Sequence, residues 1–197
     1  VENVLFEKLY NITFTESGLP TGANWSVSLY NFTNSVVYSL NLYSYWYNYG
    51  VYGSVYDAYN GYIYVTSVYG ELEIIDPITQ NLVGEIYVEG GLSGIVYDSA
   101  NHNLYVTDYY YNNVAVINTT LNQVIQYINV GSIPLKELYD ASNNYIYVSN
   151  FNSDDVTVIN GNNNEVVATI GTGNGSYGMA LDSQNGYLYV ANWNSNN

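Results

Sequence analysis

Tyr64-Val65-Thr66-Ser67 is the first of four similar tetrapeptides that decide the fold of this chain. The others follow at intervals of 41, 42 and 42 residues: Tyr105-Val106-Thr107-Asp108, Tyr147-Val148-Ser149-Asn150 and Tyr189-Val190-Ala191-Asn192. A repeat of roughly 40–45 residues built from short strands is typical of a β-propeller, in which each repeat forms one four-stranded sheet, or blade. The spacing therefore predicts an all-β propeller with about 3.5 repeats.

Each repeat has the same internal order. A short apolar run ends in an aspartate, and an asparagine follows three residues later, as in Asp57 and Asn60-Gly61. Asn-Gly between apolar runs predicts a hairpin turn, because both residues tolerate positive φ. The Tyr-Val strand comes next, followed by a third strand (72–76, 114–118, 156–160) and a fourth (82–88, 124–130, 166–170). Val, Ile and Tyr favour strands, and no window has the period of an amphipathic helix, so we expect four antiparallel strands per repeat and no helix.

The Tyr-Val strand is apolar on both faces, since Tyr62 and Tyr64 alternate with Ile63 and Val65. A sheet that is apolar on both faces has to be covered on both, as it is when blades stack around an axis. This pattern favours a propeller over a half-exposed sheet.

The repeats resemble the YVTN-type β-propeller repeats of archaeal surface-layer and related extracellular proteins. The residues that carry the resemblance are the tetrads, the Asp before the Asn-Gly turn, and the segments Val116-Ile117-Asn118 and Val158-Ile159-Asn160. It covers about residues 50–197 and implies a propeller of a surface or binding protein. The motif carries no catalytic residue.

Residues 1–49 form a different segment, for which two interpretations stay open. The stretch 11–20 with Trp25 to Leu29 resembles a β-sandwich module of archaeal extracellular proteins, but it is too short for a whole sandwich. Alternatively, 27–40 aligns with 156–170, a third and a fourth strand, and would close a four-bladed ring by pairing with the last repeat. We expect repeats at 50–91, 92–132, 133–176 and an incomplete one at 177–197, either as a partial propeller or as this closed ring. Because the last repeat stops after its second strand, we also expect the chain to be part of a longer protein.

The composition excludes some classes of function. Two basic residues against 17 acidic ones give a net charge of −15, and binding to nucleic acid needs clustered Lys and Arg. No stretch is long and apolar enough to span a membrane, and there is no cysteine. Only 10% of the residues are charged, whereas 30 are Asn. A polar, uncharged surface suits a medium in which carboxylates are protonated, so we expect an extracellular or cell-surface location in an acidic habitat.

Five sequons of the form Asn-x-Ser/Thr are candidates for glycosylation if the protein is secreted: Asn11, Asn24, Asn31, Asn118 and Asn174.

Candidate catalytic chemistry is sparse. The four repeated aspartates could form a ring around a cation, but we interpret each as accepting backbone N–H bonds in its own turn, because they recur in every repeat. His102 is the only histidine, and its place in the hairpin turn predicts a solvent-facing tip without a neighbouring nucleophile. We therefore expect no catalytic residue, metal site or cofactor, and no enzyme activity.

An aromatic residue follows three of the four tetrads. Because strands alternate in direction, these loops and the Gly-rich connections between repeats should emerge at the same end of the sheets. Exposed rings there suit sugar stacking or protein contact, although the rings could equally pack between the sheets. The candidate binding residues are Tyr109, Tyr110, Tyr111, Phe151 and Trp193.

The first functional hypothesis is a non-enzymatic, cell-surface propeller module in a surface layer, in adhesion or in glycan binding. Its partners would be envelope proteins or glycans, and open strand edges would allow self-association. The alternative is a propeller-type lactonase or lyase with a divalent cation held by carboxylates, for which the loops offer Glu89, Asp108, Asp154 and Asp155.

Overall fold

The computed structural model describes residues 11–14, 25–30, 36–42 and 51–195, with side chains in the last of these ranges. The chain divides into two compact units, Val1–Gly50 and Val51–Asn197. The first unit holds one three-stranded sheet, in the order β1 (Asn11–Phe14), β2 (Trp25–Tyr30) and β3 (Val36–Leu42). No helix that could cross a membrane occurs in the described ranges.

The second unit is a succession of antiparallel sheets that follow the sequence repeats. The first sheet consists of β4 (Val51–Tyr56), β5 (Ile63–Ser67), β6 (Glu71–Asp76) and β7 (Asn81–Tyr87). The second consists of β8 (Leu92–Asp98), β9 (Asn103–Asp108), β10 (Asn113–Asn118) and β11 (Gln123–Asn129). The third consists of β12 (Pro134–Asp140), β13 (Tyr145–Asn150), β14 (Asp155–Asn160) and β15 (Glu165–Gly171). The last has two strands, β16 (Ser176–Asp182) and β17 (Tyr187–Asn192).

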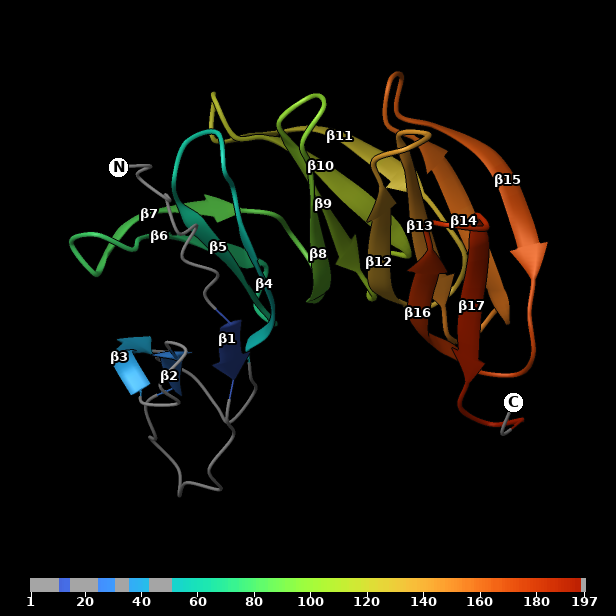
Figure 1. Ribbon diagram of the computed structural model, residues 1–197, viewed down its shortest axis with the longest axis horizontal. Helices are drawn as coiled ribbons and strands as arrows, with labels where there is room; N and C mark the ends of the chain where they lie inside the picture. The colour runs from blue at the N-terminus through green and yellow to red at the C-terminus, as the bar shows by residue number, and fades with distance from the viewer. Residues whose placement is uncertain (1–10, 15–24, 31–35, 43–50, 196–197) are drawn as a thin grey trace, which may run out of the picture. The chain divides into compact units, whose positions relative to one another are not determined.

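The sheets are arranged as blades of a propeller. Within each sheet the strands pair in chain order, and the first strands of successive sheets lie next to one another (Figure 1). The fourth strands lie on the outside. The predicted all-β propeller is confirmed. Within Val51–Asn197 the described residues form three sheets of four strands and one of two, and the closure of a ring by residues 27–40 stays a prediction.

The turn between the first and second strands is built by side-chain oxygens, as expected. Asp57 Oδ1 accepts a bond from the backbone N–H of Tyr59 (2.8 Å), and Asn60 Oδ1 accepts one from that of Tyr62 (2.9 Å). Between them Gly61 has a φ of 81°. The same position has a φ of 60°, 59° and 74° in the next three turns, at His102, Asn144 and Gly186. The recurring Asp-x-x-Asn sequence therefore ends one strand and starts the next by local hydrogen bonding.

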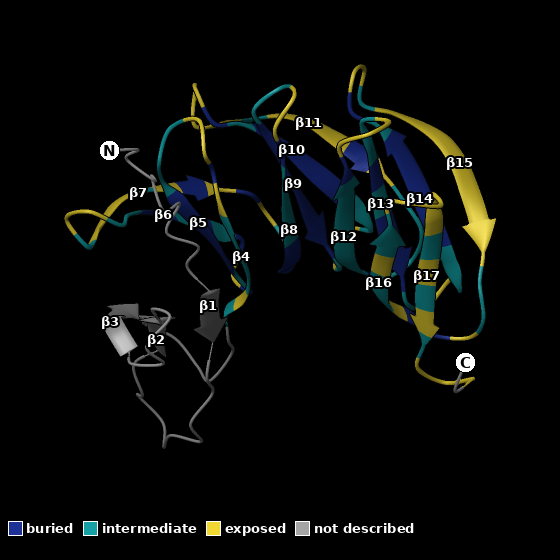
Figure 2. Ribbon diagram, viewed as in Figure 1, coloured by how far each residue is buried: buried dark blue, intermediate teal, exposed yellow. Residues whose placement is uncertain are grey.

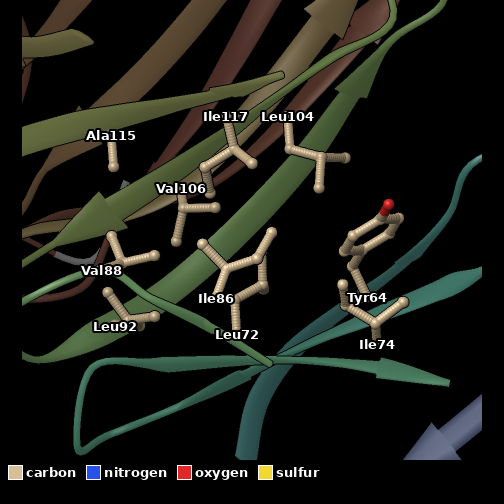
Figure 3. Packing of buried hydrophobic residues seen from close by; sticks show 10 residues of the cluster. All are labelled: Tyr64, Leu72, Ile74, Ile86, Val88, Leu92, Leu104, Val106, Ala115 and Ile117. Carbon is tan, nitrogen blue, oxygen red and sulfur yellow. The ribbon is translucent and has the colours of Figure 1, made fainter. Parts of the chain in front are cut away.

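The cores lie between neighbouring sheets. In the second strand of the first sheet Ile63, Tyr64 and Val65 are all buried, so both of its faces are covered, as predicted. One core fills the space between the first and second sheets (Figure 3): Tyr64, Leu72, Ile74, Ile86, Val88, Leu92, Leu104, Val106, Ala115 and Ile117. An equivalent core joins the second and third sheets: Tyr105, Val114, Val116, Ile128, Ile146, Val148 and Ile159. Alternate residues of one strand thus serve two cores.

The tyrosines of the first two tetrads also connect neighbouring sheets by hydrogen bonds. The Tyr64 hydroxyl accepts a bond from Asn60 Nδ2 (2.8 Å) and donates to Asn122 Oδ1 in the next sheet (3.1 Å). The Tyr105 hydroxyl donates likewise to Asn164 Oδ1 in the third sheet (2.6 Å). Both tyrosines are fully buried, and burial raises the pKa of Tyr105 to about 12. Each hydroxyl therefore enters the core without leaving an unpaired polar group.

Removing one such hydroxyl tests its contribution to stability. We expect Tyr105→Phe to lower the free energy of unfolding by about 1–2 kcal/mol, because Asn164 Oδ1 loses a donor in a buried environment. Tyr189→Phe is the matched control: it is the same change at the same repeat position, where the side chain is 55% exposed, and it should change stability by less than about 0.5 kcal/mol. Urea denaturation followed by circular dichroism measures both. Equal effects of the two substitutions would contradict this role.

Candidate functional site

Three turns and three connections meet at one end of the sheets. The turn between the second and third strands hydrogen-bonds to the connection that enters the same sheet. The three equivalent bonds run from the N–H of Tyr109, Phe151 and Trp193 to the carbonyl oxygens of Gly91, Ile133 and Gly175, at 3.0, 2.9 and 2.8 Å. We call this region, formed by residues 109–112, 151–154 and 193–195 with connections 88–91, 130–133 and 172–175, the aromatic end. These bonds agree with the expectation that the loops after the tetrads and the Gly-rich connections emerge at the same end of the sheets.

Tyrosines gather at the turn of the second sheet. The rings of Tyr109 and Tyr110 have centroids 4.7 Å apart and are tilted by 37°. Burial and the neighbouring Tyr110 raise the pKa of Tyr109 to about 12, while Tyr110 and Tyr111 are 67% and 59% exposed. The backbone of Gly91 lies directly beneath this pair, since a Cβ there would be 2.6 Å from both rings. Tyr109 therefore supports the exposed ring of Tyr110.

A buried carboxylate holds this turn in place. Asp108 Oδ1 accepts bonds from the backbone N–H of Gly91 (3.0 Å) and of Tyr110 (2.9 Å), and the side chain is fully buried. Asp108 Oδ2 has no partner. The same is true of one side-chain oxygen at the two equivalent positions, Asn150 Oδ1 and Asn192 Oδ1. Because the feature recurs in three sheets, we attribute it to the fold rather than to one ligand.

The other predicted binding residues lie at equivalent positions, but no single cluster holds all five. Phe151 is half-buried in the third sheet. Trp193 is 70% exposed and meets the ring of Tyr177 edge to face, with centroids 6.0 Å apart. The sequence analysis missed Tyr177, although it lies two residues after Gly175 at the start of a first strand. The aromatic end therefore presents two ring clusters, Tyr109–Tyr110 and Tyr177–Trp193.

Two of the acidic residues proposed for a cation, Asp154 and Asp155, already accept hydrogen bonds from neighbouring residues of the protein. Asp154 Oδ1 accepts a bond from the N–H of Gly175 (2.7 Å), and its Oδ2 from Asn174 Nδ2 (3.0 Å). Asp155 Oδ1 accepts one from Asn150 Nδ2 (2.6 Å). In the part of the chain that the structure describes, no three His, Cys, Asp or Glu side chains lie close enough together to hold a metal ion.

The predicted environment of His102, at the opposite end of the sheets, is wrong. Its ring is half-buried and stacks on Tyr59, with centroids 4.1 Å apart and planes 18° apart. Its Nδ1 lies 2.8 Å from the hydroxyl of Tyr97. The reason is that the left-handed turn residue points back over tyrosines of two neighbouring sheets instead of into solvent. The repeated aspartates do act in their own turns, as interpreted: Asp57, Asp98, Asp140 and Asp182 each accept a backbone N–H at 2.8–2.9 Å.

Two half-buried glutamates were also missed. Glu137 on the first strand of the third sheet accepts a bond from the N–H of Thr107 in the second sheet (2.6 Å), and burial raises its pKa to about 8. Burial and the like charge of Glu85 on the adjacent strand raise the pKa of Glu73 to about 7. The sequence does carry a signal for Glu137. The other three repeats have a glycine at the position of Lys136, namely Gly53, Gly94 and Gly178, and the charged pair Lys136-Glu137 interrupts this pattern.

The sequons differ in how their side chains are used. Asn118 Oδ1 accepts bonds from the N–H of Thr120 (3.0 Å) and of Leu121 (2.9 Å), whereas Asn174 donates its Nδ2 to Asp154. The side chain of Asn11 is not described, and Asn24 and Asn31 lie outside the described ranges.

Neither a protein-family model nor a curated protein matches this chain. Solved structures do match, at low identity. A chain of hydrazine synthase from Kuenenia stuttgartiensis is similar with a TM-score of 0.72 and 16% identity, over 84% of this chain and 49% of that one. A protein of unknown function from Bacteroides caccae is similar with a TM-score of 0.64 and 10% identity, over 85% of this chain and 64% of that one. Apo AztD from Citrobacter koseri is similar with a TM-score of 0.55 and 13% identity, over 79% of this chain and 46% of that one.

These similarities concern the fold alone, and this chain spans roughly half to two thirds of the length of each matched chain. They nevertheless correct one prediction. The expectation that the chain is not an enzyme is wrong as an inference from its architecture, because hydrazine synthase, an enzyme, contains the same fold. Fold does not decide between catalysis and binding.

The buried glutamates predict how stability depends on pH. A glutamate whose folded-state pKa lies above its ordinary value of 4.5 binds a proton more tightly in the folded state, so stability is greatest below pH 4.5 and falls as the pH rises to about 8. We expect Glu137→Gln, a neutral side chain of the same shape, to raise the melting temperature at pH 9 by at least about 4 °C over the native chain. It should have little effect at pH 4.

Glu165→Gln is the matched control, because it removes the same charge from an exposed position and isolates the effect of net charge. Thermal unfolding from pH 4 to pH 9 measures all three proteins. A melting temperature that increases from pH 5 to pH 8, or two variants that behave alike, would contradict the role of burial.

Proposed function

We propose that this chain is part of an extracellular or cell-surface β-propeller that binds a neutral glycan through its aromatic end. The observation that carries the proposal is the pair of ring clusters there, in which Tyr110 and Trp193 are more than half exposed, together with the exposed Tyr111 next to Tyr110 in the chain. Rings that lie side by side at the surface, as those of Tyr109 and Tyr110 do, indicate a contact surface more than single exposed rings such as that of Tyr87. Aromatic faces pack against the C–H faces of sugars, and the amide and carboxyl groups of these turns suit sugar hydroxyls.

The rigidity of the turn held by Asp108 and the net charge of the chain also support a neutral glycan as the ligand. Asp108 Oδ1 accepts bonds from three backbone N–H groups and so fixes the turn that carries Tyr110 and Tyr111. Because the turn is already ordered, it loses little conformational entropy when a ligand binds. At pH 7 the net charge of −15, with two basic residues in the whole chain, opposes binding to anionic polymers such as nucleic acids. A neutral polysaccharide avoids this repulsion.

The proposed location rests on chemistry and on resemblance. The tetrads resemble YVTN-type repeats of archaeal surface-layer proteins, and an envelope glycan or glycoprotein would be the natural partner in that setting. The pKa values of Glu73 and Glu137 favour the folded state at acidic pH, in keeping with the low content of charged residues. If the protein is glycosylated, Asn118 is the better acceptor of the two described sequons, because the amide nitrogen of Asn174 is already bonded to Asp154.

A binding assay with the full chain tests whether it binds neutral glycans. We expect retardation in native gels that contain neutral polysaccharides such as laminarin or mannan, and none with dextran sulfate. The double variant Tyr110→Ala/Tyr111→Ala should weaken binding at least about tenfold, because both exposed stacking surfaces are lost. Tyr187→Ala, at an equally exposed tyrosine (63%) at the other end of β17, is the matched control and should bind normally. No retardation by any neutral polysaccharide, or equal loss in both variants, would refute the proposal.

The second candidate function is a lactonase or lyase with a cation held by carboxylates. The fold shared with hydrazine synthase, an enzyme, is the observation that favours it. Titration of the full chain with Ca²⁺ or Mg²⁺ by calorimetry would then show micromolar binding that raises the melting temperature, and Asp108→Asn would abolish it. Heats of dilution alone, with no change in melting temperature, would remove this candidate.

A further inference from the structure

An ionisable ring lies in the junction between the first and second sheets. His102 is the only histidine of the chain and precedes β9, which is buried along its whole length (Figure 2). Its ring stacks on Tyr59 of the first sheet, and its carbonyl oxygen accepts a bond from Thr119 Oγ1 (2.9 Å). Its Nδ1 lies 2.8 Å from the hydroxyl of Tyr97. The ring is therefore held at a fixed place between two sheets.

The hydroxyl of Tyr97 also lies beside a buried carboxylate. Asp57 of the first sheet is fully buried, and its Oδ2 has no hydrogen-bond partner in the described part of the chain. None of the other three repeated aspartates has such an oxygen among the described residues. Burial and the carboxylate of Asp57 raise the pKa of Tyr97 to about 12, so the hydroxyl keeps its proton in acidic, neutral and mildly alkaline solution. It has this one proton for two neighbours, Asp57 and His102.

The junction between the second and third sheets shows how the fold satisfies the equivalent carboxylate without a charge. There Tyr139 lies beside Asp98, and Asn144 occupies the position of His102. One end of the Asn144 amide is 2.8 Å from the Tyr139 hydroxyl and 3.1 and 3.2 Å from the two oxygens of Asp98. We assign this end as the amide nitrogen, because a carboxylate repels an amide oxygen. A neutral donor thus serves Asp98 whatever the pH.

Protonation of His102 changes which groups are paired. When Nδ1 accepts the proton of Tyr97, Asp57 Oδ2 stays unpaired, and an unpaired buried acceptor is costly. When His102 is a cation, both ring nitrogens carry a proton. Nδ1 then donates to the Tyr97 oxygen, and the hydroxyl is free to donate to Asp57. The cation is also attracted to a buried negative charge one hydroxyl group away, so both effects favour the protonated ring in the folded state.

We propose that Asp57, Tyr97 and His102 form an acid clamp, a link that strengthens the junction between the first and second sheets when His102 is protonated. Because the folded state then holds the proton of His102 more tightly than the unfolded state does, the clamp adds stability in acid. This stability is present below about pH 6 and is lost as the pH rises toward about 8, the range in which histidine side chains change charge.

The other groups around the ring do not oppose its protonation. Tyr59 presents an aromatic face, which attracts a cation, and Asp98 at the start of the same turn is acidic. The turn 118–123, which packs behind His102, has no charged residue. The one Lys or Arg among residues 51–195 is Lys136, which lies on β12 in the third sheet.

The variant His102→Asn removes the charge and keeps the turn, because asparagine occupies the same position in the third sheet at a φ of 59°. We expect the native chain to gain about 3 °C in melting temperature over this variant at pH 5 relative to pH 8, measured by circular dichroism. Glu73 and Glu137 are present in both proteins, so their effect on the pH dependence cancels in the difference.

Two further variants test the link through the hydroxyl. In a Tyr97→Phe background, the effect of His102→Asn should change by less than about 1 °C between pH 5 and pH 8, because no hydroxyl connects the ring to Asp57. Gly186→His is the matched control, since it places a histidine at the same turn position of the fourth sheet, where Leu181 stands in place of Tyr97. It should leave the pH dependence of the melting temperature unchanged.

Hydrogen exchange locates the effect. At pH 5 the amides of residues 57–62 and 98–103 should exchange more slowly in the native chain than in His102→Asn, whereas those of 140–145 should be unchanged. The proposal is overturned if the difference in melting temperature is the same at both pH values or larger at pH 8, or if Tyr97→Phe leaves it intact. Slower exchange spread evenly over the chain would overturn it too, because the clamp acts on one junction.

Discussion

A strand that is apolar on both faces has no stable place at a surface, and every other feature of this structure depends on that constraint. Tyr64 and Val65 point to opposite sides of one strand, and both are buried. One sheet can cover only one of these faces, so sheets have to follow one another. The cores between them share strands: Leu104 and Val106 belong to one core and Tyr105 to the next. Stability is thus distributed over interfaces between neighbours, as in other repeat proteins.

Polar groups make this stacking specific. Tyrosine brings a hydroxyl into each core, and the bonds from Asn60 to Tyr64 and on to Asn122 satisfy it. The asparagine that accepts the bond belongs to the following sheet, so the pairing sets how far one sheet is displaced along its neighbour. Buried aspartates such as Asp57 and Asp98 play a similar part within the turns, because their oxygens accept backbone N–H groups that the ladders leave free.

The same architecture concentrates functional options at the ends of the strands, where sequence can vary without disturbing the cores. At one end, Asp108 holds a turn that presents Tyr110 and Tyr111. At the other, His102 occupies a position that is glycine or asparagine elsewhere and stacks on Tyr59. A fold shared with an enzyme leaves both binding and catalysis open, so the chemistry of these ends carries the functional argument.

The amino-acid sequence by itself determined the strands, their order and the turns between them, because these depend on residues near one another in the chain. The alternation of Tyr64 with Val65, the Asp-x-x-Asn turns and the shared end of the aromatic loops all follow from such local patterns. The tertiary structure alone decided which side chains meet across sheets. The bond from the Thr107 N–H to Glu137, the stacking of His102 and the pairing of Trp193 with Tyr177 join segments whose distance depends on how sheets pack. The burial of Glu137 and Glu73 and the raised pKa values that follow from it are properties of that packing, and no local pattern encodes them.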